Sequence, residues 1–172
     1  MSFESKILNN TKISEDYFDG DYKFDYLPSI IGIQYAITNT VEKTIIDEPK
    51  TDRVEKFTDL ENLFIKLLNF LNKNEFENYK VKISQKLSDE SLKHWKPEKR
   101  ENERKRLCKE IYLDRIGVEW RKDFWDFEND EIIYNEKYEI TLSFIDDKHR
   151  DEHRITVEIN PKNLDIYDVF FE

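Results

Sequence analysis

Two histidines and a group of acidic residues lie close together near the carboxyl end of the chain. In the stretch FIDDKHRDEHRITVEI, Asp151 and Glu152 directly precede His153, and His149 lies four residues before it. A histidine beside a carboxylate can be oriented and poised for proton transfer near neutral pH. Imidazole and carboxylate groups are also metal ligands, and a closed zinc site needs about four of them. The stretch is therefore a candidate for acid–base or metal chemistry.

The residues that follow indicate that this cluster lies at the start of a β-strand. Ile155, Val157 and Ile159 alternate with polar residues, so they face a buried side, and His153 shares their parity. The spacing of His149 and His153 would bring two ligands together on a helix, but here it spans a predicted hairpin. We therefore expect no metal and no cofactor, and interpret the acidic residues as a polar network that fixes the register of the hairpin.

The same alternation extends over the last third of the chain. Apolar residues alternate with polar ones over 138–144 and over 155–159, and the apolar segment 164–172 follows the turn sequence NPKN. A period of two with one apolar side is typical of strands with one buried and one wet face. This pattern predicts a three-stranded antiparallel meander.

Helices and further strands are predicted before the meander. Leucine and phenylalanine recur at three- and four-residue spacing over 59–72, which predicts a helix, and Thr58 with Glu61 has the pattern of a capping box. Pro97 suits the first turn of a second helix that Gly117 would end. Strands are predicted over 30–38 and 78–87. We expect one α+β domain over 1–172, with an antiparallel sheet that includes the C-terminal meander packed against two main helices.

The charge and composition exclude several classes of protein. The chain has 28 Lys and Arg against 38 Asp and Glu, a net charge of −10, whereas a general nucleic-acid binder needs a dominant basic face. Its apolar runs fall far short of the roughly 20 residues of a membrane span, and MSFESKILNN is not typical of a signal peptide. The single cysteine, Cys108, permits no intrachain disulfide and is predicted to be a small core residue. We expect a cytoplasmic protein that binds neither nucleic acid nor membrane.

An aromatic segment, GVEWRKDFWDFEND, has two interpretations. It is either a loop that closes one end of the core or an exposed anchor for a protein partner, because Trp and Arg dominate interface hot spots. The second interpretation, together with the acidic hairpin, gives a candidate partner-binding set. Its members are Trp120, Asp123, Trp125, Asp126, Asp146, Asp147, Asp151, Glu152 and His153.

The order of these segments resembles a diffuse group of uncharacterised bacterial α+β domains. The resemblance rests on DYFDGDYKF near the start and, near the end, on YEITLSF followed by DEHRITVEI and a last strand. The matching motif is Asp151, Glu152 and His153, with Arg154 where related sequences often have glycine. Some members are associated with toxin systems as immunity proteins, and the resemblance implies an α+β fold more than any chemistry.

Three functions are compatible with these observations. The first is a non-enzymatic intracellular protein-binding domain, most concretely an immunity-type inhibitor whose acidic surface attracts a basic bacterial toxin domain. The second is a small hydrolase or nuclease-like enzyme that uses His153 with Asp151 or Glu152, although no GxSxG, P-loop or HExxH motif is present. The third is an acidic DNA mimic, which the basic segment 93–106 disfavours. We expect the first.

Overall fold

One sheet carries all the strands of the described chain, in the order of the sequence. A computed structural model describes residues 2–39, 52–127, 131–149 and 154–172, with only the backbone described at 39, 123–127, 131–135 and 149. The elements are β1 (Asn9–Ile13), β2 (Tyr17–Tyr22), β3 (Ile31–Asn39), α1 (Arg53–Phe70), α2 (Lys73–Glu90), α3 (Pro97–Glu110), β4 (Tyr112–Phe127), β5 (Glu131–Ile145), the short 3-10 helix η1 (Asp147–His149), β6 (Arg154–Ile159) and β7 (Ile166–Phe171).

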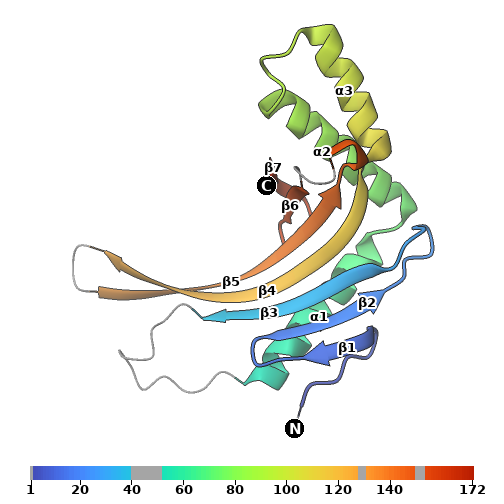
Figure 1. The fold of residues 1–172 in the computed structure, drawn as a ribbon. Coiled ribbons are helices and arrows are strands. Elements are labelled where there is room, and N and C mark those ends of the chain that lie inside the picture. The colour runs from blue at the N-terminus through green and yellow to red at the C-terminus, as the bar shows by residue number, and fades with distance from the viewer. Residues whose placement is uncertain (1, 40–51, 128–130, 150–153) are drawn as a thin grey trace.

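The sheet is antiparallel except at its centre. Its seven strands are ordered β1 to β7, and the one parallel pair is β3 with β4, with Tyr35 opposite Val118. A parallel pair needs a long crossover, and the three helices form it. Figure 1 shows α1 behind β1–β3, α2 and α3 near one end of β4 and β5, and the long ribbon of β4 and β5 extending past β3. The α+β class is therefore confirmed, with three helices in place of the two that the sequence predicts.

A single apolar core lies between the helices and one face of the sheet. Strand residues of one parity, such as Tyr35, Val118 and Leu142, are fully buried together with Leu60 of α1 and Ile83 of α2. Residues of the opposite parity form what we call the outer face of the sheet. In the C-terminal meander, Ile155, Val157 and Ile159 are buried, as the alternation predicts. Apart from Thr156, which has outward parity but is buried, parity in β6 separates core residues from residues available for contact.

Helix α1 begins earlier than predicted, and its cap is a different residue. Asp52 is the N-cap, and its side chain accepts a hydrogen bond of 3.1 Å from the amide of Glu55. The capping-box prediction is wrong, because Thr58 lies inside the helix and donates to the carbonyl of Val54 at 2.7 Å. Glu61 is instead buried and accepts from the Lys6 amide at 2.9 Å, which ties the N-terminal segment to α1.

The segment predicted as a strand over 78–87 forms part of helix α2. Phe76, Tyr79, Ile83 and Leu87 are buried at helical spacing, whereas Val81 is exposed. The local alternation of Tyr79, Val81 and Ile83 imitates a strand, but the longer stripe decides the structure. The Asn72 side chain caps this helix by accepting from the Glu75 amide at 2.9 Å.

Helix α3 begins at Pro97 as predicted but ends at Glu110, before Gly117. Leu107 is its buried residue, and Cys108 is only half-buried, so the core assignment of the cysteine is not confirmed. The loop interpretation of the aromatic segment is also wrong, because residues 117–127 belong to β4. No described helix is both long enough and apolar enough to cross a membrane.

Candidate functional site

Of the contact residues predicted on β4, one is buried, and the others have side chains outside the described part of the structure. Trp120 is 2% exposed and packs in the core, with the Lys56 amine 4.7 Å from its ring centroid. Trp120 is therefore a core residue and not a partner anchor, which corrects the prediction. The side chains of Asp123, Trp125 and Asp126, farther along β4, lie outside the described part of the structure, so their role stays a prediction.

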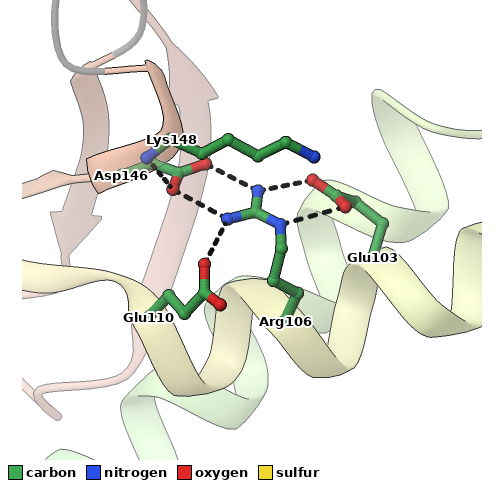
Figure 2. A network of polar contacts seen from close by, with 5 residues as sticks. All are labelled: Glu103, Arg106, Glu110, Asp146 and Lys148. Atoms are coloured by element: carbon green, nitrogen blue, oxygen red, sulfur yellow. Dashed lines mark hydrogen bonds and ion pairs between the residues drawn. The ribbon is translucent and has the colours of Figure 1, made fainter.

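Asp146 is also buried, as one half of an ion pair between β5 and α3. Arg106 donates to both of its carboxylate oxygens, through Nη1 to Oδ1 at 2.9 Å and through Nη2 to Oδ2 at 2.7 Å (Figure 2). The Lys148 amide adds a hydrogen bond of 3.2 Å to Oδ1. Such a bidentate pair is geometrically specific. Asp146 therefore holds the end of β5 against the helix, and its placement corrects its assignment as a partner contact.

The same guanidinium holds two acidic residues of α3. Arg106 Nε donates to Glu103 at 3.0 Å and Nη1 donates to Glu110 at 2.8 Å (Figure 2). Hydrogen bonds to Asp146 and then to Glu103 raise the pKa of Arg106 above its ordinary value. The hydrogen bond from Arg106 lowers the pKa of the Glu103 carboxyl. We interpret this network as a structural clamp.

The rest of the predicted hairpin cluster contributes little to a described site. Asp147 is exposed beside the clamp. Asp151, Glu152 and His153 lie outside the described residues, so their role stays a prediction. Over the described ranges, no three His, Cys, Asp or Glu side chains are grouped so that they could hold a metal ion.

A different acidic group lies on the outer face of the sheet. Glu119 of β4 is directly opposite Glu139 of β5, and Glu158 of β6 is directly opposite Asp168 of β7. Glu158 also pairs with Thr141, two residues from Glu139, which makes Glu139 its diagonal neighbour. These four carboxylates, here called the acidic row, cross four neighbouring strands. The outward parity of Glu139 and Glu158 is visible in the sequence, but their proximity depends on strand register.

Basic residues neutralise only part of the acidic row. Arg121 lies 3.5 Å from Glu119 and 4.0 Å from Glu139, and Lys137 lies 2.6 Å from Glu139. Burial raises the pKa of Glu158, and the charges of Glu139 and Asp168 raise it further. The row is thus a surface on which like charges repel one another, and an added cation would stabilise it.

A groove continues from this surface along the part of β5 that β6 does not cover. Strand β6 ends at Ile159, opposite Ile140, whereas β5 continues back to Glu131. The space beside β5, here called the edge groove, has a volume of about 910 Å³ and is bounded by β5 residues 136–140, Asp59, Asn62 and Leu63 of α1, and the turn after β6. This volume lies within the range of ligand sites.

The turn that closes the edge groove is firmly held. Leu164 is buried with φ of 62°, a conformation that is strained for a leucine. Its carbonyl accepts a hydrogen bond from the Tyr79 hydroxyl of α2. Lys66 of α1 donates to the carbonyls of Pro161 and Lys162, both at 2.8 Å. The wall of the groove is therefore preorganised before any partner binds.

The described geometry offers charge and shape for binding, with polar groups in fixed positions at the edge of a sheet. His94 is exposed on the segment between α2 and α3, far in sequence from the acidic row. Neither protein-family models, nor curated proteins, nor solved structures provide a match for this chain.

Proposed function

We propose that this chain is a non-enzymatic intracellular protein-binding domain that binds a basic protein through the outer face of its sheet. The single observation that carries the proposal is the acidic row, which crosses four strands and is only partly neutralised. A partner that presents lysine or arginine relieves the repulsion between these carboxylates. The net charge of −10 adds long-range attraction for such a partner.

The most concrete form of this function is an immunity-type inhibitor of a bacterial toxin. Toxins that act on nucleic acid are basic, because they bind a polyanion. An acidic inhibitor gains association rate from electrostatic steering toward such a toxin. The resemblance of the terminal segments to domains linked with toxin systems supports this form.

The test captures the partner and then removes charge from the acidic row. The tagged chain is cross-linked to its partner in the source cells and captured at low salt. The association rate of the purified pair is then measured. In the test variant, Glu119→Gln with Asp168→Asn, shape is kept and two charges are lost. The matched control is Glu77→Gln with Glu90→Gln, at exposed positions of α2.

We expect the test variant to associate about tenfold more slowly than the control at low salt, and the difference to shrink at high salt. If the captured partner is a toxin, its co-expression with this chain restores growth. Equal association rates for the two variants, or the lack of any stoichiometric partner, would contradict the proposal.

A further inference from the structure

Over residues 136–139, strand β5 presents one backbone edge to the edge groove. Strand β5 pairs with β4 as far as Phe127 and Glu131, but β6 covers only Ile140–Ile145. Along Glu136–Glu139, the described ladder joins β5 to β4 on one side, and the other side of β5 lies along the groove. Alternate residues of a strand direct N–H and C=O to opposite sides, so two of these four residues offer both groups to the groove.

The two sides of the free edge differ in chemistry. Tyr138 and Ile140 have core parity and, with Leu63 of α1, give one side of the groove its apolar surface, beside Asp59 and Asn62. On the outer side, Glu139 and Glu158 line the groove. A strand laid along this edge would alternate in the same way, with apolar residues toward α1 and cationic residues toward the outer face.

The charges that line the groove favour a positively charged occupant. Its lining includes the acidic residues Asp59, Glu136, Glu139 and Glu158 against Lys137 and Lys162. Lys137 lies against Glu139 at 2.6 Å. Glu158 has no ion-pair partner within 4.0 Å among the described side chains, and a lysine or arginine of an added strand would reach it at the β6 end of the groove. An anionic ligand, or a second copy of this acidic edge, would meet like charge instead.

We propose that the edge groove takes an extended segment of a protein partner as an added β-strand on β5, with apolar side chains toward α1 and lysine or arginine toward Glu139 and Glu158. Main-chain hydrogen bonds to the free edge supply affinity, and the two unlike sides supply orientation. The segment spans about 14 Å, the length of four antiparallel residues. The preorganised turn at Leu164 stops it at one end. This mode of binding rests on the proposed function and specifies how the partner is recognised.

The test uses short synthetic peptides in place of the partner. The first alternates lysine and valine, and the second alternates glutamate and valine. Two further forms of the lysine peptide carry N-methyl groups, one on every lysine and the other on every valine, so that each form loses the amide donors on one edge only. Binding is measured by fluorescence anisotropy, and backbone protection by hydrogen exchange followed with NMR.

We expect the lysine peptide to bind at least about tenfold more tightly than the glutamate peptide. One N-methylated form should bind about tenfold more weakly, because it loses its hydrogen bonds to β5, and the other should bind as before. The two groove-facing amides within 136–139 should gain protection. Glu158→Gln should weaken binding about threefold, whereas the control Glu77→Gln should not change it.

Several outcomes would overturn strand addition. Equal weakening by the two N-methylated forms, or binding without protection of the 136–139 amides, would show charge attraction alone. Concentration-dependent dimerisation that protects these amides in the free protein would assign the edge to a second copy. If strand addition fails while Glu119→Gln with Asp168→Asn still slows binding of the captured partner, the protein-binding function stands and only this mode of recognition falls.

Discussion

Replacing Arg106 tests whether the clamp between α3 and β5 stabilises the fold. The change Arg106→Met keeps an unbranched stem but removes both hydrogen bonds to Asp146, at 2.9 Å and 2.7 Å. The Asp146 side chain is 2% exposed, so the change removes the guanidinium that balances a buried charge. Breaking a buried pair in this way costs about 3–5 kcal/mol.

The geometry places the expected loss near the lower end of that range. The Arg106 side chain is 17% exposed, so water reaches the site once the guanidinium is gone. We expect the free energy of unfolding to fall by about 3 kcal/mol at neutral pH. The matched control is Arg104→Met on the same helix, because Arg104 pairs with Glu101, whose side chain is 49% exposed. Such a surface pair contributes little to stability, because water and salt screen it.

Urea unfolding followed by circular dichroism measures both variants, and an unchanged m-value shows that the two changes are comparable. A third variant combines Arg106→Met with Asp146→Asn, which also removes the buried negative charge. We expect it to be more stable than Arg106→Met alone. The clamp interpretation fails if Arg106→Met and Arg104→Met differ by less than about 1 kcal/mol, or if the combined variant is the least stable.

Three other changes test separate features of the fold. Because the pKa of Glu158 is raised in the folded chain, the protein loses stability as pH rises through that pKa. Glu158→Gln should therefore stabilise the protein at neutral pH by about 0.5–1 kcal/mol, and this gain should vanish in acid. Urea unfolding across pH measures the difference. Gly20→Ala should lower stability by about 1–3 kcal/mol, since a Cβ there would lie 2.8 Å from a neighbouring side chain. The control Gly32→Ala should leave stability unchanged, because a Cβ there meets nothing within 4 Å. Thermal melts compare the two variants. Tyr79→Phe should cost about 1–2 kcal/mol by removing the hydrogen bond to the Leu164 carbonyl, and an unchanged midpoint of urea unfolding would contradict this role.

The sequence correctly predicts the parts of the fold that have long periodic patterns of apolar residues. The stripe of α1, including Leu60 and Leu67, extends over several turns, and the parity of Ile155 and Val157 holds over a whole strand. The segment around Val81 misleads because Tyr79 and Ile83 fit both periods, and the exposed Val81 between them completes a strand-like alternation. Phe76, which decides for a helix, lies outside that short window.

The site is harder to predict, because its residues meet only through tertiary structure. Arg106 and Asp146 are 40 positions apart, and nothing local in either segment indicates their pairing. Glu119 and Glu139 become neighbours through the register of β4 and β5. The parallel pairing of β3 with β4, across three helices, is likewise invisible to a local pattern. The sequence does not distinguish a core role from a contact role for Trp120, because aromatic residues are typical of both cores and interfaces.

The alternation around Glu119 in β4 and around Glu158 in β6 has a consequence for how such a protein can diversify. Each outward side chain is one position away from a buried one, so Glu119 lies between Val118 and Trp120, and Glu158 lies between Val157 and Ile159. Substitutions at the outward positions can rewrite the displayed charges while the interior keeps its shape. A lineage of such chains can therefore change the charge pattern of its outer face in small steps, each leaving the scaffold intact.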